Sequence, residues 1–263
     1  MSEPQRASRR RLLGLLAAGA TAIMGRGTVA AGGRSGLSGG FGVETAQSDD
    51  KTHSPPIKVD LNLALDLDAS GSVNQRRFEL QRRGYVEAFG DPRVLAAIRS
   101  GPRAAIGVSM YQWTGPRLQA SVVGWTHIHD ETSIRGLAEK VAWGERYLFG
   151  GGTSISGAID YGVQALAAAP FDAARQVIDI SGDGANNRGR AVNAARNDAV
   201  GAGININGLP ILELEPDLDE HYSSNVIGGP GAFIVAADTF EAFSDAIRLK
   251  LIREIASFDK FKV

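Results

Sequence analysis

The 263-residue chain contains no cysteine. This excludes disulfides, thiolate metal sites, a cysteine nucleophile and a lipid anchor on an N-terminal cysteine. An excess of one charge is also missing, because 28 basic and 29 acidic residues give a formal net charge of −1. Nothing therefore indicates a nucleic-acid surface. Apolar residues make up 43% of the chain, which is ordinary for a soluble globular protein, and the length suits an export signal and one domain.

The chain also has little that could span a membrane near its start. The apolar run at 12–24 is too short and too rich in alanine and glycine to predict a membrane span. It follows three arginines at 9–11 and precedes the small residues Ala30 and Ala31, which is the arrangement of a secretory signal. The paired arginines resemble the twin-arginine export signal of bacteria. We predict a signal peptide at 1–31, cleaved after Ala30 or Ala31, and a periplasmic or secreted protein; the alternative is a basic N-terminus followed by a short hydrophobic helix.

The remaining chain divides into a linker and one domain. Residues 32–56 are rich in glycine and serine and end in two prolines, which predicts a flexible linker. From residue 57 to 263, strand and helix patterns alternate. This predicts an α/β fold, a doubly wound, mostly parallel six-stranded sheet with helices on both faces and one antiparallel edge strand. The predicted strands are 58–68, 104–113, 119–125, 176–180, 204–209 and 232–235. The predicted helices are 74–89, 94–98, 132–142, 155–167, 190–200 and a last one opened by a capping box at 238–241.

The first strand leads into a loop of oxygen-bearing side chains. Leucines at 61, 63, 65 and 67 alternate with Asn62, Ala64, Asp66 and Asp68, a two-residue period that marks a strand. Asp68, Ser70 and Ser72 then follow two residues apart, so an extended loop can direct their oxygens to one point. One carboxylate with two hydroxyls suits Mg²⁺, Mn²⁺ or Ca²⁺ and is a poor set for Zn²⁺ or Cu²⁺.

Two later segments are predicted at the same end of the sheet. Thr153 follows three glycines and leads into a helix, and Asp183 follows the strand at 176–180. In such sheets ligands bind outside the carboxyl ends of the strands, where the strand order reverses. We therefore expect Thr153 and Asp183 to join the residues that follow the first strand.

These three segments, in this order, resemble the von Willebrand factor type A domain over about residues 57–257. The sequences of the first strand and of the segment SGDGANN at 181–187 also resemble those of a group of exported bacterial proteins of unknown function that carry this domain. The resemblance implies a metal-ion-dependent adhesion site. Ser70 and Ser72 would bind the ion directly, and Asp68, Thr153 and Asp183 would bind it directly or through water.

The resemblance also implies a function. One coordination position would remain for water or for the carboxylate of a partner, so we expect one divalent cation, Mg²⁺ first and Mn²⁺ or Ca²⁺ next. The expected partner is a protein or peptide that offers an Asp or Glu, with no nucleic acid and no stable membrane span after signal cleavage. The expected role is metal-dependent protein binding in the bacterial cell envelope, without catalysis.

Five further residues are expected to orient the ligands or to face the partner: Asp66, Ser154, Gly182, Gly184 and Asn186. A carboxylate within a central strand is costly unless it is paired. Asp66 would orient a metal-bound water, or it would be a structural carboxylate bonded to a nearby arginine or backbone amide.

An enzyme is the main alternative. Asp66-x-Asp68 and the later GDG-x-NN segment resemble the haloacid-dehalogenase-type phosphatases. Asp66 would then form an aspartyl phosphate, Asp68 would be the acid/base, and Mg²⁺ would hold the phosphoryl oxygens. Three departures oppose this: Ser70 replaces Thr or Val, Asn187 replaces the final Asp, and no lysine lies between residues 140 and 250. A metal-free scaffold is a third reading, opposed by the five intact ligand positions.

Three other features have competing interpretations. His127 and His129 share one face of the predicted edge strand and could bind a transition metal, although exposed edge residues are favoured. The segment 186–188 borders the site and selects partners, or is an Asn-rich turn. The segment 147–149 is an exposed apolar rim or ordinary core, and core is favoured.

Overall fold

The computed structural model describes residues 55–256. The predicted signal at 1–31 and nearly all of the predicted linker at 32–56 lie outside these residues. Within them, five strands form a sheet in the order β3-β2-β1-β4-β5. The strands are β1 (Ile57–Asp68), β2 (Ile106–Trp113), β3 (Gln119–Ile128), β4 (Phe171–Gly182) and β5 (Asn205–Pro210). Neighbouring strands are parallel except for β3, which pairs antiparallel with β2 at one edge, as predicted.

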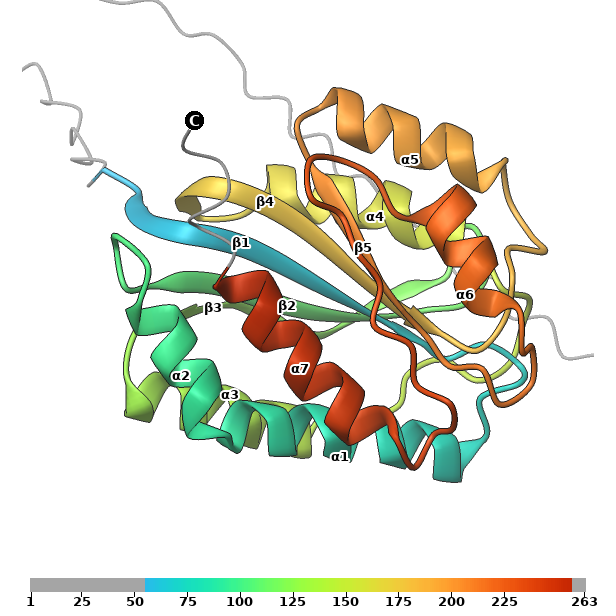
Figure 1. Cartoon of the computed structure of the whole chain (residues 1–263), viewed down its shortest axis with the longest axis horizontal. Helices are drawn as coiled ribbons and strands as arrows, with labels where there is room; N and C mark the ends of the chain where they lie inside the picture. The colour runs from blue at the N-terminus through green and yellow to red at the C-terminus, as the bar shows by residue number, and fades with distance from the viewer. Residues whose placement is uncertain (1–54, 257–263) are drawn as a thin grey trace, which may run out of the picture. The chain divides into compact units, whose positions relative to one another are not determined.

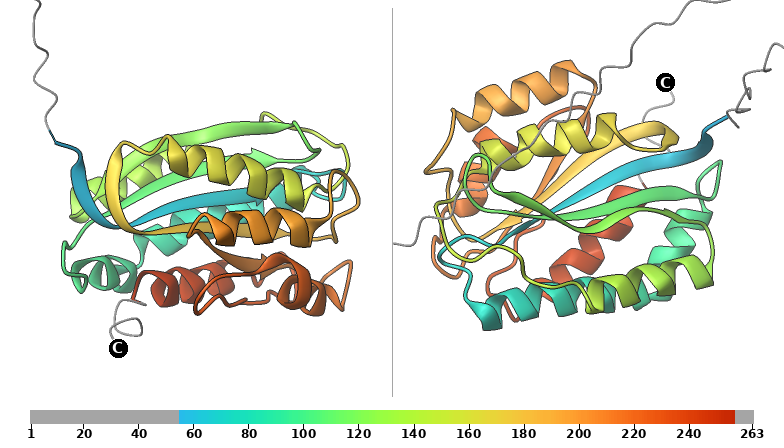
Figure 2. Two further views of the ribbon diagram at one scale, coloured as in Figure 1. Left: turned by 90° about the horizontal axis from the view of Figure 1, so that it is seen from above. Right: turned by 180° about the vertical axis from the view of Figure 1, so that it is seen from behind.

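Helices cover both faces of the sheet (Figure 1, Figure 2). The helical elements are α1 (Gln75–Gly90), α2 (Pro92–Arg99), α3 (Glu131–Ala142), α4 (Ile155–Ala167), α5 (Val192–Gly201), α6 (Leu218–His221), the short π-helix η1 (Tyr222–Val226) and α7 (Phe243–Ile255). Helices α1, α2, α3 and α7 lie on one side, and α4 and α5 lie on the other. The predicted α/β class and the doubly wound arrangement are confirmed.

The alternation along β1 divides the core in two. The leucines at 61, 63, 65 and 67 pack in the cluster formed with α1, α2, α3 and α7. Ala64 faces the opposite way and packs in the cluster formed with α4 and α5. Successive side chains of a strand point to opposite faces, so this central strand supplies both layers.

The predicted sixth strand is not a full member of the sheet. Ile234 and Ala237 form only isolated parallel bridges, with Gly208 and Ile211 respectively. Pro210 ends β5 and has no N–H to donate to a ladder, so pairing on this edge is interrupted. The segment 213–230, which lies between β5 and the predicted sixth strand, contains α6 and η1.

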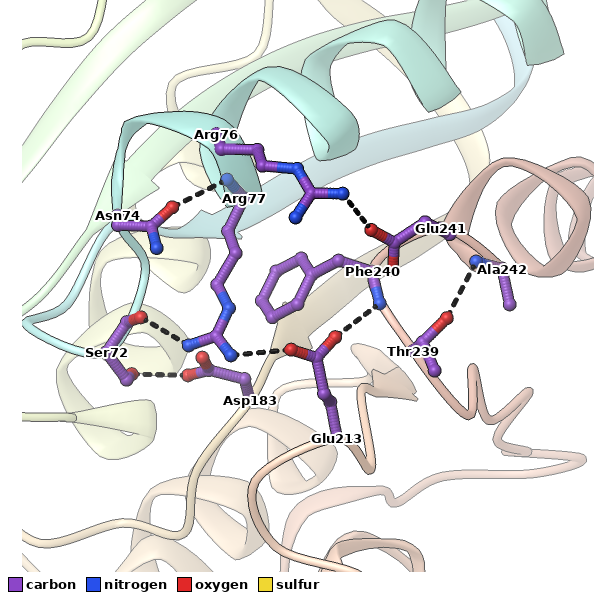
Figure 3. A network of polar contacts seen from close by, with 10 residues as sticks. All are labelled: Ser72, Asn74, Arg76, Arg77, Asp183, Glu213, Thr239, Phe240, Glu241 and Ala242. Atoms are coloured by element: carbon purple, nitrogen blue, oxygen red, sulfur yellow. Dashed lines mark hydrogen bonds and ion pairs between the residues drawn. The ribbon is translucent and has the colours of Figure 1, made fainter.

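The predicted capping box at the start of the last helix is wrong. Helix α7 begins at Phe243, after Ala242, and no side chain caps it in the expected way. The Thr239 hydroxyl instead accepts a hydrogen bond from the Ala242 N–H at 3.3 Å. Glu241 forms an ion pair with Arg76 on α1 (Figure 3). Glu241, the side chain expected to complete the capping box, therefore pairs with α1 instead.

The sheet order creates a switch point between β1 and β4. The chain continues from β1 to β2 on one side and returns to β4 on the other. Asp68 pairs in register with Trp113 at the end of β2, and Leu67 pairs with Ser181 near the end of β4. The segments that follow β1 and β4 therefore emerge side by side, where ligands bind in open α/β sheets. Among the helices of residues 55–256, none is long and apolar enough to cross a membrane.

Candidate metal centre

The loop after β1 is held by its own polar groups. The backbone N–H of Ser70 donates to Oδ1 of Asp68 at 2.6 Å. The hydroxyl oxygens of Ser70 and Ser72 lie 3.2 Å apart. The N–H of Val73 donates to the carbonyl of Ser70 at 3.1 Å, which closes the turn. The hydroxyls of Ser70 and Ser72 thus lie close together, and Asp68 is bonded to the same turn.

Asp183 joins this loop from the end of β4. The Ser72 hydroxyl donates to Oδ1 of Asp183 at 2.6 Å (Figure 3). The Arg77 guanidinium donates to the carbonyl of Ser72 at 2.9 Å and forms a 2.6 Å ion pair with Glu213. Glu213 also accepts the N–H of Phe240 at 3.1 Å, so one arginine connects the Ser72 loop to the segment before α7.

The glycine-rich loop before α4 supplies Thr153. The N–H of Thr153 donates to Oδ1 of Asn187 at 2.9 Å, and the carbonyl of Thr153 accepts the N–H groups of Asn187 and Arg188. The N–H of Gly71 donates to the carbonyl of Gly151 at 3.2 Å, which binds the loop to the Ser70–Ser72 turn. Gly151 has a φ of +99°, a conformation that glycine adopts without strain.

A cavity of about 270 Å³ opens between these loops. Three of the predicted ligands, Ser72, Thr153 and Asp183, line it, and Asp68 and Ser70 are buried next to them. The other lining residues are Gly71, Gly151, Gly152, Gly184, Asn187, Leu214 and Glu215. The structure therefore brings together all three predicted segments.

Two buried carboxylate oxygens at this site lack a partner. Oδ2 of Asp68 and Oδ2 of Asp183 accept no hydrogen bond from any residue in 55–256. Burial, followed by the charge of Asp183, raises the pKa of Asp68 to about 7. Burial also raises the pKa of Asp183, although its bond from Ser72 opposes the shift. Buried polar atoms normally have partners, so these two oxygens fit a cation bound between them.

The donor set restricts the kind of ion. Within the described part of the chain, no group of three or more His, Cys, Asp or Glu side chains is placed to hold a metal. A cation here would need the hydroxyls of Ser70, Ser72 and Thr153 beside the two carboxylates. Hard oxygen donors of this kind suit Mg²⁺, Mn²⁺ or Ca²⁺.

The residues expected beside the ligands have separate positions. Ser154 is buried and caps α4 by accepting the N–H of Gly157, so it does not face the cavity. Asn186 accepts the N–H of Ser156 and donates to the carbonyl of Arg190. Gly184 lines the cavity. A Cβ on Gly182 would lie 3.0 Å from Oδ2 of Asp68, so this glycine allows close packing behind the site.

Asp66 is neither at the cavity nor bonded to an arginine or amide. Its carboxylate lies beneath α4, where a Cβ added to Gly162 would be 3.2 Å from Oδ2. Neither oxygen has a partner among residues 55–256. Burial, followed by the charge of Asp179, raises its pKa well above the usual range. The prediction of a paired structural carboxylate is therefore wrong, and a protonated side chain is favoured here.

The two histidines remain apart from this centre. His127 and His129 stack with ring centroids 4.6 Å apart at edge strand β3. Nε2 of His129 lies 3.4 Å from Asp130. Burial lowers the pKa of His127.

Sequence reasoning missed several residues around the cavity. Glu215 lines it and accepts the N–H of Ala185 at 2.9 Å. The acidic run at 213–220 was the available signal. Within the segment 186–188, which the sequence predicted to border the site, Asn187 lines the cavity and Asn186 does not. The expectation that 147–149 is core is also wrong, because the side chains of Tyr147 and Phe149 are exposed.

The family of the chain is shown by a match to a family model. The model of a family described as "Protein of unknown function (DUF1194)" matches residues 58–259. The chain belongs to this family. No curated protein sequence matches the chain.

Solved structures show the fold. The pilus adhesin SpaC of Lactobacillus rhamnosus GG has a TM-score of 0.54 at 14% identity, covering 76% of this chain and 31% of its own. Proximal thread matrix protein 1 of the mussel byssus has a TM-score of 0.52 at 13% identity, covering 76% and 47%. The SpRpn10 VWA domain has a TM-score of 0.51 at 14% identity, covering 72% and 94%. The chain spans less than half the length of the first two. The DUF1194 domain described here thus has the von Willebrand factor type A fold.

Proposed function

We propose that this protein is a divalent-cation-dependent protein-binding module of the bacterial cell envelope. Asp68, Ser70, Ser72, Thr153 and Asp183 would hold the cation, and a carboxylate of the partner would complete its coordination. The observation that carries this proposal is the 2.6 Å bond between Ser72 and Asp183, beside two buried carboxylate oxygens that have no hydrogen-bond partner among residues 55–256. The predicted twin-arginine signal supports the location.

The cation would decide whether a negatively charged ligand can bind. A bound divalent cation would offset the charge of the two carboxylates among its five protein ligands, and its open coordination position would accept an oxygen of an external carboxylate. Without a cation, the charged side chains that line the cavity are Asp183 and Glu215. Both are acidic and would repel a carboxylate. Binding of an acidic partner should therefore require the metal. Mg²⁺ is the first candidate because it retains open positions for water or an external oxygen.

The shape of the site favours a side chain over a small-molecule substrate. The cavity of about 270 Å³ is at or below the small end of typical ligand pockets, which are roughly 300–1,000 Å³. The phosphatase alternative needs Asp66 to attack a phosphoryl group. That carboxylate is buried beneath α4 and is not among the cavity residues, which favours binding over this chemistry.

Affinity selection would test the proposal. The immobilised protein is offered a library of capped peptides with a central Asp or Glu, and a matched library with Asn or Gln, in Mg²⁺ and in EDTA. We expect retention of acidic peptides in Mg²⁺ alone, and loss of retention in Asp183→Asn. Equal recovery in both buffers, or no recovery, would contradict the proposal. Turnover of a generic phosphate ester that Asp66→Asn abolishes would favour the phosphatase.

A further inference from the structure

Two aromatic side chains are exposed on the segment that leads into the cavity. Tyr147 is 52% exposed and Phe149 is 70% exposed. Phe149 stands two residues before Gly151, a cavity residue, so their Cα atoms are at most about 7.6 Å apart. Single exposed apolar residues are common, but two on one short segment beside a binding cavity indicate an interaction surface.

The backbone of this segment is fixed from inside the protein. Gln112 on β2 is fully buried, and its Oε1 accepts the N–H groups of Tyr147 at 2.8 Å and Leu148 at 3.2 Å. Its Nε2 donates to the carbonyl of Glu145 at 2.6 Å. A buried side chain that satisfies three backbone groups holds the segment in one conformation. The exposed rings are therefore presented on an ordered backbone.

Arg146 ties the same segment to the metal loop. Its guanidinium donates to the carbonyl of Val73 at 2.6 Å and to that of Ala69 at 3.3 Å, on either side of Ser70 and Ser72. Its Cζ lies 4.9 Å from the centre of the Phe149 ring, within the range of a cation–π contact. Phe149 thus contacts Arg146, which also binds the backbone of the loop that carries Ser70 and Ser72.

The surroundings of the cavity add a third apolar side chain and an exposed arginine. Leu214 lines the cavity and is 47% exposed. Arg188 lies against Gly152, because a Cβ added there would be 3.0 Å from Nε of Arg188. Arg188 is exposed and forms no ion pair with any residue in 55–256. Its charge complements an acidic partner.

We propose that Tyr147, Phe149 and Leu214, here called the apolar rim, select the sequence of the partner. The partner is an extended peptide segment that carries an apolar side chain one or two residues from the Asp or Glu entering the cavity. Two residues of an extended chain span about 6.6 Å, which lies within the limit of about 7.6 Å between the Cα atoms of Phe149 and Gly151. This inference rests on the proposed function, because the carboxylate sets the register of the peptide.

The rim should contribute a measurable share of the affinity. Aromatic residues are enriched among the side chains that dominate binding energy. An ordered rim also loses little conformational freedom on binding. Burying one large apolar side chain corresponds to a change in Kd of about ten- to a hundred-fold. We therefore expect Phe149→Ala to weaken peptide binding by that factor, while cation binding stays unchanged.

The test uses the acidic peptide library with randomised flanking positions, in Mg²⁺. Wild type is compared with Phe149→Ala, Tyr147→Ala and the control Ile57→Ala. Ile57 is 53% exposed, as much as Tyr147, and stands at the opposite end of β1 from the site. Calorimetric titration with Mg²⁺ and thermal unfolding verify that each variant is folded and binds the ion.

We expect wild type and Ile57→Ala to select apolar residues next to the acidic one, and both rim variants to lose this selection. Acidic peptides retained in Mg²⁺ without apolar preference, equally by Phe149→Ala, would overturn the rim and leave the proposed function intact. Absence of Mg²⁺-dependent acidic selection would overturn both. Self-association of wild type in sedimentation velocity that Phe149→Ala abolishes would assign the rim to a second copy and overturn the peptide proposal.

Discussion

The hydroxyl of Ser72 donates a 2.6 Å hydrogen bond to the carboxylate of Asp183, which connects the loop after β1 with the end of β4. These two residues are 111 positions apart in sequence. Their contact depends on the sheet order, which makes β1 and β4 neighbours. It places a hydroxyl and a carboxylate together in the wall of a small cavity.

Asp68→Asn should separate metal binding from folding. The amide oxygen can still accept the N–H of Ser70, but the buried charge is removed. At about pH 8, above its pKa of about 7, the wild-type carboxylate is ionised, and its Oδ2 has no hydrogen-bond partner in the described part of the chain. We expect at least a tenfold loss of Mg²⁺ affinity and, in EDTA, an unfolding free energy equal to or above that of wild type. Calorimetry and urea denaturation measure the two effects. The exposed Asp172→Asn is the control, and unchanged Mg²⁺ affinity in Asp68→Asn would refute this role.

Gly182→Ala should disturb the back of the site. The added methyl would lie 2.9 Å from the Tyr222 hydroxyl and 3.0 Å from Oδ2 of Asp68. Overpacking of this kind costs about 1–3 kcal/mol, and we expect weaker Mg²⁺ binding as well. Gly90→Ala is the matched control, because nothing lies within 4 Å of its added Cβ. A Gly182→Ala protein as stable as Gly90→Ala would show that the packing is looser than described.

Lys250→Met should strongly destabilise the fold. Lys250 is fully buried on α7 and lies 2.6 Å from Asp179 and 3.3 Å from Glu254. Removing one member of a buried ion pair leaves uncompensated charge and costs about 3–5 kcal/mol. Lys140→Met, at an exposed position on α3, should change stability by no more than about 0.5 kcal/mol. Urea denaturation at about pH 8, where Asp179 is ionised, compares the two, and similar values for both would contradict the buried pair.

The same cluster should make stability depend on pH. Burial raises the pKa of Asp179 to about 7, against the opposing effect of Lys250 and with the support of Glu254. In the unfolded chain the pKa is about 3.9. The folded state therefore retains a proton between about pH 4 and 7. The resulting stabilisation is complete below about pH 4 and is lost as the pH rises through 7, by up to about 1.4 kcal/mol per pH unit.

Denaturation of wild type and Asp179→Asn in EDTA from about pH 5 to 8 tests this linkage. The unfolding free energy should fall less steeply with pH in the variant, since one titrating group is gone. Asp172→Asn should retain the wild-type slope. Identical slopes in wild type and Asp179→Asn would show that the proton is held elsewhere.

The main helices and strands and the three predicted ligand segments can be predicted from the sequence because each depends on a local pattern of residues. The two-residue alternation of β1 placed its leucines on one face, and Asp68, Ser70 and Ser72 stood in one short loop. Asp183 was placed by the rule that ligands gather at the carboxyl ends of parallel strands. These inferences needed only strand order and spacing.

The errors concern contacts that spacing does not encode. Tyr147 and Phe149 resemble core residues by composition but are exposed, on a segment whose backbone is bonded to buried Gln112. Glu241 pairs with Arg76 instead of capping α7. Asn187, and not its neighbour Asn186, lines the cavity. Each outcome depends on a partner more than thirty positions away.

Calorimetric titration of the chelator-treated protein with Mg²⁺, Mn²⁺ and Ca²⁺ tests the central claim most directly. Wild type is compared with Ser72→Ala and with Ser121→Ala, which removes an exposed hydroxyl from edge strand β3. We predict saturable binding of one ion by wild type and Ser121→Ala, and at least tenfold weaker binding by Ser72→Ala. Equal affinity in all three proteins, or no ion bound by wild type, would contradict the assignment of a metal centre to the Ser72–Asp183 contact.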